Sequence, residues 1–595
     1  MSHPRHAAAI TRRDALKAAA AAGIATATFT PDFAQAAPSL TFPQGIASGD
    51  PQTTGVIIWT RAVPDDQRSD FQLVWQVSRQ PDMSVHFTGG VVNVTAANDW
   101  LVKVDVQGLE PGTTYYYRFY RQDQRSAIGT TRTLPAGDVA KLRLAMFSCA
   151  NYEKGFFNVY GHAAQRGDID FVLALGDYIY EYAPGGYVTA AMAAGAVTEP
   201  RADLVLPRKE IVAADDYRQR YITYKSDPDL QALHAKAPWI VVWDDHETAD
   251  NAWKDGAHNH QPATEGSWVA RKIAAVNAFY NWLPIREPAG GTRIDAAGNP
   301  APIYRRFDFG NLARLAMLDT RLVGRDAQFE TADEIASPQL YAVYAGMTAT
   351  GEFPLDVTAA GVSRQILGQA QEAWLADQIA TSTQTWQVIG SQMLYQYQPT
   401  PDYMSSAILT TAEKAQLSGL LDQLFGKGTG AQFAALGAAG APSPSAQDAW
   451  TGYPAAKLRL GRMLAAAKNP LVLAGDSHNA WAANLSLATT QGIRPLGVEF
   501  GTSSVTSPGF EQTLIGVDPA KLARLLIETS ANRSVLDKLV YADTARRGYV
   551  VIELTPSAAR AEYVAFNNVF TRSYTATTDA VFQVAAGAKA MTRLS

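Results

Sequence analysis

Four short polar clusters contain residue types that bind metal ions, and each cluster follows an apolar run. They are Ser148-Cys149-Ala150-Asn151, Gly176-Asp177-Tyr178-Ile179-Tyr180, Trp243-Asp244-Asp245-His246-Glu247 with Asp250-Asn251, and Gly475-Asp476-Ser477-His478. Together they use the only cysteine of the chain and two of its nine histidines. Carboxylate, imidazole, thiolate and phenolate groups are the ligands through which proteins hold cations. The four clusters therefore predict a metal centre.

Such a centre suits the hydrolysis of phosphate esters. The negative oxygens of the ester resist a nucleophile, whereas two or three cations neutralise them and lower the pKa of a bound water towards neutrality. His246 is a candidate proton donor to the leaving alkoxide, or a contact to the phosphate. The sequence contains no Gly-x-Ser-x-Gly elbow, so nothing in it supports a serine esterase.

The apolar runs before the clusters are predicted to be buried strands. Residues 171–175 form a short continuous apolar run that Gly176 ends, and residues 142–149, 239–243 and 470–474 have the same character. Helical stretches alternate with them at about 156–166, 215–235, 268–283 and 369–381. Open α/β sheets build their sites at the carboxyl ends of strands, which is where these clusters fall.

Residues 38–136 have a different character and predict a small all-β domain. Strand-like runs at 55–60, 71–77, 90–94, 100–106 and 114–121 are separated by Gly, Pro and Asp. The stretch Leu109 to Arg118 resembles the corner of fibronectin type III and immunoglobulin-like modules. We expect a signal segment at 1–37, a β-sandwich at 38–136, a catalytic domain at 137–575 with an insertion at about 400–455, and a tail at 576–595.

The N-terminus has the pattern of an export signal. Thr11 to Lys17 contains a pair of arginines, an alanine-rich stretch runs from Ala18 to Phe29, and Ala34-Gln35-Ala36 offers a cleavage site. The pattern predicts export by the twin-arginine machinery to the periplasm or beyond; the alternatives are a Sec signal or an ordinary alanine-rich helix. The sequence contains no other apolar stretch of the roughly 20 residues that span a bilayer. The formal net charge of −5, without blocks of like charge, does not suggest a nucleic-acid surface.

Cys149 allows two interpretations. It has no second cysteine to pair with, although exported proteins often carry disulfides. A lone thiol is either buried and inert or held by another group. Its place at the end of a predicted strand favours the role of a metal ligand.

The spacing of the four clusters resembles the calcineurin-like metallophosphoesterase plan. Three positions depart from the commonest form of that plan: Cys149 replaces an Asp, Asp245 an Asn, and Asp476 a His. These departures, together with the β-sandwich and the twin-arginine signal, resemble the PhoD-type alkaline phosphatase/phosphodiesterase family. The stretches Leu318-Asp319-Thr320-Arg321 and Leu367-Gly368-x-x-Gln371-x-x-Trp374-Leu375 match that family as well.

The resemblance implies a four-layer αββα catalytic domain that holds ferric iron and calcium. Strongly donating thiolate and phenolate ligands suit Fe³⁺, and an oxygen-rich set suits Ca²⁺ better than Zn²⁺. The implied ligands of Fe³⁺ are Cys149, Tyr180, a bridging Asp177 and His478, and those of Ca²⁺ are Asp245, Asp476 and Asn251. Asp244 is a ligand or orients His246, and Asp250 is a further possible ligand. Arg321 contacts the substrate phosphate or forms a structural pair with Asp319.

We therefore expect an exported, metal-dependent enzyme that hydrolyses phosphate mono- and diesters. One alternative is a phospholipase D-like phosphodiesterase that acts on lipids or cell-wall polymers at the same site. The other is a cell-envelope binding protein in which the metals are structural.

Overall fold

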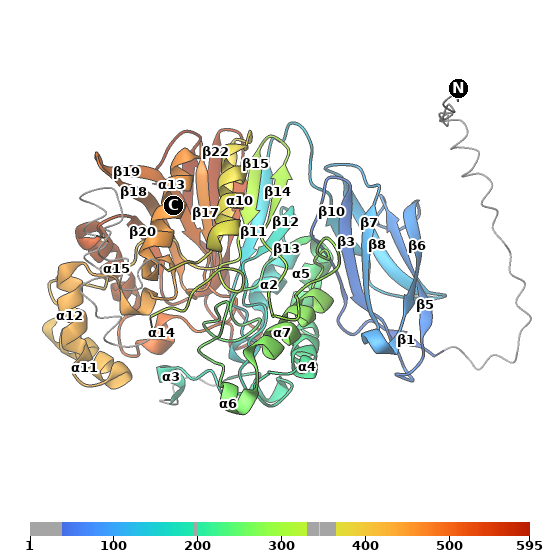
Figure 1. The fold of residues 1–595 in the computed structure, drawn as a ribbon, viewed down its shortest axis with the longest axis horizontal. Helices are drawn as coiled ribbons and strands as arrows, with labels where there is room; N and C mark the ends of the chain where they lie inside the picture. Colours follow the sequence, from blue (N-terminus) through green and yellow to red (C-terminus); the bar gives the residue numbers. More distant parts are fainter. Residues whose placement is uncertain (1–37, 194, 196–198, 330–343, 345–363) are drawn as a thin grey trace, which may run out of the picture.

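The computed structural model describes residues 38–193, 195, 199–329, 344 and 364–595. A β-rich N-terminal region lies at one end of the molecule and the helices α11 and α12 at the other, with a large α/β region between them (Figure 1). The expected signal segment, 1–37, lies outside the described residues. Among the residues that are described, we find no helix long and apolar enough to cross a membrane.

The N-terminal region is the expected β-sandwich. One sheet has the strand order β10-β8-β5-β6, with β9 beside β8, and it faces the strands β2, β3 and β7. In β8, Tyr115, Tyr117 and Phe119 are buried and their neighbours are not, because alternate residues of a strand face opposite sides. The strands are β1 (Leu40–Thr41), β2 (Ile46–Gly49), β3 (Gly55–Arg61), β4 (Val63–Pro64), β5 (Phe71–Ser78), β6 (His86–Val94), β7 (Leu101–Gln107), β8 (Thr114–Arg121), β9 (Gln124–Arg125) and β10 (Gly129–Arg132).

The second sheet of the sandwich continues into the catalytic domain. Gly49 at the end of β2 pairs in parallel with Trp239 of β13, so β2, β3 and β7 belong to a 10-stranded sheet. A side chain at Gly49 would collide with the backbone oxygens of Trp239 and Pro284, so the close approach requires glycine. The division into two domains predicted from the sequence thus crosses a continuous sheet.

The catalytic domain consists of two sheets packed face to face. In the first, β11, β12 and β13 are parallel neighbours, and in the second β15, β16, β17 and β19 are parallel neighbours. The remaining strands of the first sheet are β21 (Arg547–Leu554), β22 (Ala558–Phe566), β23 (Ala576–Ala585) and β24 (Thr592–Arg593), beside β11 (Leu142–Phe147), β12 (Phe171–Ala174) and β13 (Trp239–Val241). The second contains β14 (Arg305–Phe309), β15 (Ala313–Met317), β16 (Trp386–Gly390), β17 (Pro470–Ala474), β18 (Ala480–Thr489), β19 (Gly492–Gly501) and β20 (Lys538–Asp543).

Helices cover the outer faces and complete the expected αββα order. One apolar core joins both sheets: the rings of Phe171 in β12 and Phe309 in β14 meet edge to face at 5.2 Å. A second core lies between the other face of the second sheet and two helices, where Leu375 and Leu458 pack. The helices are α2 (Asn158–Gln165), α3 (Ala190–Ala193), α4 (Ala214–Lys225), α5 (Pro228–Lys236), α6 (Pro262–Glu265), α7 (Trp268–Trp282), α10 (Gly368–Ala380), α11 (Thr411–Phe425), α12 (Thr429–Ala439), α13 (Pro454–Ala466), α14 (Phe510–Thr513) and α15 (Pro519–Arg533).

Two sequence expectations differ from the structure. The supposed tail at 576–595 contains β23, which pairs along its length with β22, and β24 pairs with β23. The stretch 215–235 is two helices, because the carboxylate of Asp227 accepts hydrogen bonds from the first N–H groups of a new helix and Pro228 follows it.

The expected insertion at 400–455 contains α11 and α12, which lie beside α15 (Figure 1).

Candidate metal centre

The four clusters named from the sequence meet at one edge of the two sheets. Cys149 follows β11, Asp177 follows β12, Asp244 follows β13 and Asp476 follows β17. A hydrogen bond joins the loops of the two sheets there: the Oγ atom of Ser148, after β11, accepts from the N–H of Asp476, after β17, at 3.1 Å. The parallel strands thus bring together residues that are more than 300 positions apart in the chain.

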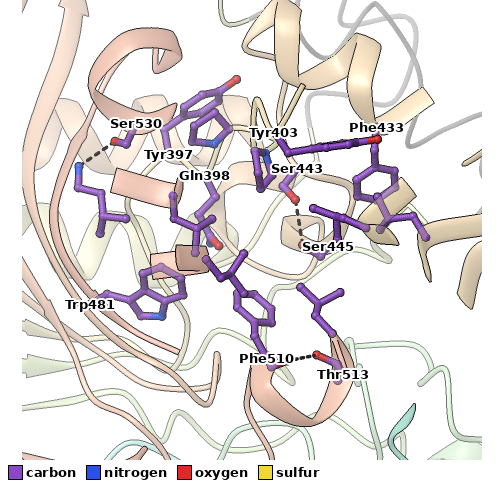
Figure 2. Close-up of a pocket in the computed structure, with 18 of the residues that line it drawn as sticks. Tyr397, Gln398, Tyr403, Phe433, Ser443, Ser445, Trp481, Phe510, Thr513 and Ser530 are labelled. Atoms are coloured by element: carbon purple, nitrogen blue, oxygen red, sulfur yellow. Dashed lines mark hydrogen bonds between the residues drawn. The ribbon is translucent and has the colours of Figure 1, made fainter. Parts of the chain in front are cut away.

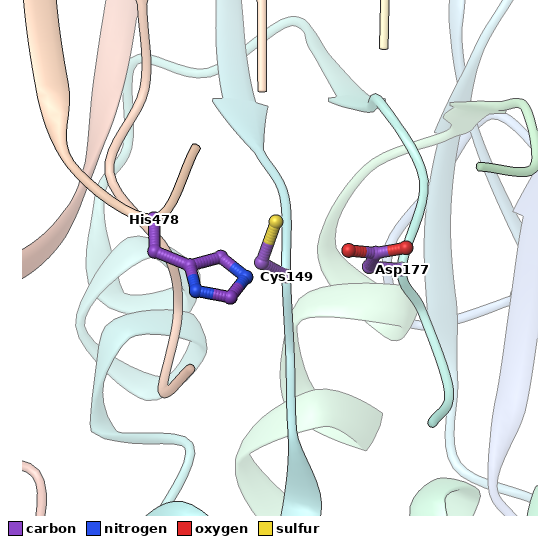
Figure 3. A group of neighbouring side chains, drawn as sticks. All are labelled: Cys149, Asp177 and His478. Carbon is purple, nitrogen blue, oxygen red and sulfur yellow. The ribbon is translucent and has the colours of Figure 1, made fainter. Parts of the chain in front are cut away.

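Three overlapping groups of side chains have potential ligand atoms within 4.8 Å of one another. They are Cys149 with Asp177 and His478, Asp177 with Asp245 and His246, and Asp177 with Asp244, Asp245 and Asp476. In the first group the His478 ring and the Asp177 carboxylate lie on either side of the Cys149 thiol (Figure 3). Asp177 belongs to all three groups, which is the position that a bridging carboxylate requires.

The backbone adopts left-handed conformations at the predicted ligands. Among the described residues, 11 that are not glycine have positive φ, and five of them are site residues named from the sequence. They are Cys149 (φ 61°), Asp177 (55°), Asn251 (55°), Asp476 (64°) and His478 (62°). Such conformations cost free energy and persist where the surrounding structure enforces them, which is common at functional sites.

The site contains more negative charge than the protein itself neutralises. Burial raises the pKa of Cys149 well above its usual range, and the charges of Asp177 and Asp476 raise it further. Burial likewise raises the pKa of Asp177, against the lowering effect of His246. Within the described part of the chain, the Oδ1 atom of Asp177 and the Oδ2 atom of Asp244 are buried without a hydrogen-bond partner. A bound cation would satisfy these oxygens, so the residues present fit a metal.

His478 presents a lone pair to this site. Its Nδ1 atom donates a hydrogen bond to the Pro508 carbonyl at 2.7 Å, with the tautomer assigned from that acceptor. The Nε2 atom is then unprotonated and faces the Tyr180 hydroxyl at 3.3 Å. Burial lowers the pKa of His478 to about 3, so the ring is neutral. A ring fixed through its far nitrogen is the usual arrangement of a metal-binding histidine.

Tyr180 lies between the predicted iron ligands. Its hydroxyl lies 3.1 Å from Oδ2 of Asp177 and receives a hydrogen bond from the Ser507 hydroxyl at 2.7 Å. Burial raises the pKa of Tyr180, and the charge of Asp177 adds to the effect. The phenol oxygen is therefore placed beside Asp177 and His478, and its role as a ligand stays a prediction.

His246 is held from behind by a carboxylate. Its Nδ1 atom lies 2.7 Å from Oε2 of Glu181, and its ring stacks on Tyr180 with the centroids 4.0 Å apart. Burial lowers the pKa of His246, but the charges of Glu181, Asp245 and Asp177 outweigh it and hold the pKa well above its usual range. The Nε2 atom lies 3.9 Å from Asp250 and is the nitrogen available to a ligand.

Glu247 holds two of the ligand loops together. Its carboxylate accepts hydrogen bonds from the backbone N–H groups of Asp177 at 3.1 Å, Tyr178 at 2.5 Å and Asp244 at 2.7 Å. Gly176 lies against Asp244, and any side chain at that glycine would overlap it. The two loops are thus fixed at a short distance from each other.

Arg321 pairs with carboxylates other than the Asp319 group that the sequence suggested. Its side chain is fully buried and pairs with Asp244 and, through two nitrogens at 2.6 and 2.8 Å, with Asp448. Its NH2 atom also lies 3.6 Å from Asp245 and from Asp476. The Asp319 carboxylate accepts hydrogen bonds from the backbone N–H groups of residues 321 and 322, and within the described part of the chain no ion pair joins it to the Arg321 guanidinium. The guanidinium thus pairs with carboxylates of the site, and its contact with a substrate phosphate stays a prediction.

The last two named residues lie in the loop after His246. The backbone N–H of Asn251 donates to Oδ2 of Asp245 at 2.7 Å, and that of Asp250 donates to Oε1 of Glu181 at 2.7 Å. These two hydrogen bonds tie the backbone of the loop to the carboxylates of Asp245 and Glu181.

Four residues of the site were given no role from the sequence. Glu247 belongs to the third of the four clusters and Glu181 directly follows Tyr180, so position alone offered a signal for them. Asp448 lies in the expected insertion, where nothing in the sequence pointed to Arg321. Tyr187, whose ring lies 6.3 and 6.4 Å from the rings of His246 and His478, follows a glycine-rich stretch without a pattern.

The fold and the site define a two-sheet αββα phosphoesterase, and comparisons with known proteins agree. The PhoD-like phosphatase model matches residues 144–563, and the model of the PhoD-like phosphatase N-terminal domain matches residues 25–135. Alkaline phosphatase D of Bacillus subtilis (strain 168) is 30% identical over 536 residues, which cover 88% of this chain and 77% of that protein. A solved structure of PhoD superposes with a TM-score of 0.72 at 28% identity and covers 95% of this chain and 94% of the other.

The chain therefore belongs to the PhoD-like phosphatase family. It is a phosphoric ester hydrolase of the alkaline phosphatase D type, with the β-sandwich and αββα architecture predicted from its sequence.

Proposed function

We propose that this chain is an exported enzyme that hydrolyses phosphate mono- and diesters at a centre of Fe³⁺ and Ca²⁺. The observation that carries the proposal is the place of Asp177 in all three groups of ligand atoms. Cys149, Tyr180 and His478 would hold iron on one side of Asp177. Asp245, Asp476 and Asn251 would hold calcium on the other side.

The donor chemistry supports this choice of cations. Thiolate and phenolate are charged, strongly donating ligands that stabilise a trivalent ion, whereas carboxylate and amide oxygens favour a hard divalent ion. When bound, the cations neutralise the phosphate oxygens and activate water for attack. Asp244 has one oxygen committed to Arg321, so we assign it to holding that arginine and, through its second oxygen, to the rim of the centre.

A side chain of the protein, that of His246, would protonate the leaving group. Glu181 fixes the Nδ1 side of His246, so the Nε2 nitrogen is the one that faces the site. A protonated Nε2 is placed to donate a proton to the departing ester oxygen, which otherwise leaves as an unstable alkoxide. Stacking against Tyr180 keeps the ring in one orientation.

The proposal is tested by metal analysis and turnover on the exported protein. We expect iron and calcium in the purified protein, a visible tyrosinate-to-Fe³⁺ absorption band, and release of phosphate from p-nitrophenyl phosphate and of p-nitrophenol from its diester. A calcium chelator is expected to abolish both activities and added Ca²⁺ to restore them. Full activity with zinc alone, or better recovery with Mg²⁺ or Zn²⁺, contradicts the assignment.

Export is tested separately. Arg12→Lys with Arg13→Lys is expected to leave the precursor in the cytoplasm, because the twin-arginine machinery reads that pair. Continued export of the double variant by the Sec route would show that the signal was misinterpreted.

A further inference from the structure

A second tyrosine, Tyr187, stands at the metal centre beside Tyr180. The centroid of its ring lies 5.9 Å from that of Tyr180, 6.3 Å from that of His246 and 6.4 Å from that of His478. The side chain is half-buried, and the next residue, Val188, is exposed over 62% of its surface. Tyr187 therefore lies at the boundary between the centre and the solvent.

The phenol group of Tyr187 is close to the acidic groups of the centre. Burial raises the pKa of Tyr187 well above its usual range, and the charges of four residues raise it further. They are Asp250, Cys149, Asp177 and Asp476. Within the part of the chain that the structure describes, the Tyr187 hydroxyl has no hydrogen-bond partner. It is thus a free donor near the potential metal ligands.

The loop that carries Cys149 also holds Tyr187 in place. Lys154 lies further along that loop, is buried, and donates a hydrogen bond from its ammonium group to the Tyr187 carbonyl. The carboxylate of its neighbour Glu153 accepts from the N–H of Gly185 at 2.9 Å. The backbone around Tyr187 is therefore fixed before a substrate binds, so little conformational freedom is lost when its side chain makes a contact.

A second buried cation holds the start of the same segment. The guanidinium of Arg220 donates to the carbonyl of Tyr182 at 3.0 Å. The ring of Tyr182 meets that of Tyr187 edge to face, with the centroids 5.3 Å apart, which is a favoured arrangement of two aromatic rings. Tyr187 is thus positioned through its ring as well as through its backbone.

A bound phosphate ester needs hydrogen-bond donors as well as cations, because each of its charged oxygens must be satisfied. Arg321, which the sequence suggested for this contact, already pairs with two carboxylates. An apolar cavity of about 280 Å³ beside Trp481 (Figure 2) contains no residue of the three ligand groups in its lining, so it adds no donor at the centre. The Tyr187 hydroxyl is a donor without such a commitment.

We propose that the Tyr187 hydroxyl donates a hydrogen bond to a phosphoryl oxygen of the ester bound at the centre, and that it is a substrate contact and not a metal ligand. The inference rests on the proposed function, because it adds a contact to the same centre. A phenol has an ordinary pKa of about 10 and so carries the proton that this bond needs at neutral pH. A hydrogen bond to a charged oxygen is roughly twice as strong as one between neutral groups.

The first test measures the binding of inorganic phosphate by calorimetry with the metal-loaded protein. Tyr187→Phe removes only the hydroxyl, and Tyr574→Phe is the matched control, because Tyr574 is half-buried and packs at 5.2 Å on the ring of Phe566. We expect Tyr187→Phe to bind phosphate about ten- to a hundredfold more weakly, the range of a hydrogen bond to a charged group, and the control to bind it like the wild type. Equal affinities of Tyr187→Phe and the wild type would overturn the inference.

The second test identifies the oxygen that Tyr187 contacts. It compares kcat/KM for p-nitrophenyl phosphate and for phenyl phosphate, whose leaving group is poorer. A donor to a phosphoryl oxygen lowers both values by a similar factor, whereas a donor to the departing oxygen matters more for the poorer leaving group. We expect similar losses for the two esters in Tyr187→Phe. A loss confined to phenyl phosphate would place the hydroxyl at the leaving group and contradict the inference.

The third measurement separates a substrate contact from a metal ligand. Iron per chain and the visible absorption band are expected to be the same in Tyr187→Phe and in the wild type. Loss of iron or of the band in this variant would make Tyr187 a ligand, which overturns the inference and leaves the proposed function intact. A wild type without iron would instead contradict the proposed function, and the two phosphate affinities would still decide the inference.

Discussion

The Nδ1 atom of His246 lies 2.7 Å from the Oε2 atom of Glu181, and both side chains are buried. Glu181 also accepts hydrogen bonds from the N–H of Asp250 and the side chain of Asn259. The carboxylate therefore fixes the imidazole and the following loop at the same time. This relationship leaves the Nε2 nitrogen of His246 as the one that would face the substrate in the proposed mechanism.

We expect Glu181→Gln to lower kcat by about ten- to a hundredfold, with a smaller change in KM, because an amide orients the imidazole less firmly and can donate to the nitrogen it faces. The matched control is Glu210→Gln, which alters a half-buried glutamate whose partner is Arg271. Steady-state kinetics of both variants at equal metal content checks this. Equal kcat values for the two variants would contradict the role of Glu181 in orienting His246.

Substitutions of Cys149 distinguish between its two possible roles, a metal ligand or a residue of the apolar core. If it binds iron, Cys149→Ser replaces a charged thiolate by a neutral hydroxyl, and iron per chain, the visible band and turnover are expected to fall sharply. Cys149→Asp is expected to recover part of all three, since aspartate is a charged donor. If the thiol only packs, the serine variant costs stability of about 1–3 kcal/mol and little activity. A serine variant with full iron and near-normal turnover would show that Cys149 is a packing residue of the core and not a ligand.

Asp448 tests the role of Arg321. Its carboxylate carries two of the hydrogen bonds to a guanidinium that is fully buried. Asp448→Asn is expected to lower the free energy of unfolding by about 3–5 kcal/mol, because it leaves a buried charge only partly compensated. Asp203→Asn removes a fully exposed partner of Arg208 and should change stability by less than about 1 kcal/mol. Denaturant unfolding of the two variants provides the comparison, and equal stabilities contradict the structural role.

The sequence allowed the residues that meet at the site to be named because they stand at strand ends. Apolar runs such as 171–175 identify buried strands, and parallel packing then brings their carboxyl ends together. The supporting groups could not be predicted in this way. Asp448 reaches Arg321 only through the folding of an insertion, and β23 has mixed burial on an outer strand, so its sequence resembles a tail. Partners chosen by tertiary contact leave no local pattern.

Lys225 predicts a dependence of stability on pH. Its ammonium group is buried 4.1 Å from the ring centroid of Trp59, and no hydrogen-bond partner for it is found among the described residues. Burial lowers its pKa to about 7 from 10.5. Because the folded pKa lies below the unfolded one, the unfolded chain binds more protons between these values. This group therefore makes stability rise with pH from about 7 to 10.5, by up to about 1.4 kcal/mol per pH unit.

Lys225→Met should remove that slope and raise the free energy of unfolding at pH 7 by roughly 2–5 kcal/mol, with little effect above pH 10. Lys427→Met, at an exposed position, is the control and should leave the slope as in the wild type. Urea unfolding at several pH values checks both. A slope that persists in Lys225→Met would show that the ammonium group is not the cause.

The proposed bridging of two cations by Asp177 is tested most directly by one paired measurement on Asp177→Asn. Asparagine keeps the shape but loses the charge and one of the strong oxygen donors that three ligand groups share. Iron and calcium per chain are measured by mass spectrometry on the same samples that are assayed for p-nitrophenyl phosphate hydrolysis. The account predicts that iron and calcium both fall and that turnover drops by at least a thousandfold. A variant that keeps both metals and most of its turnover would contradict it.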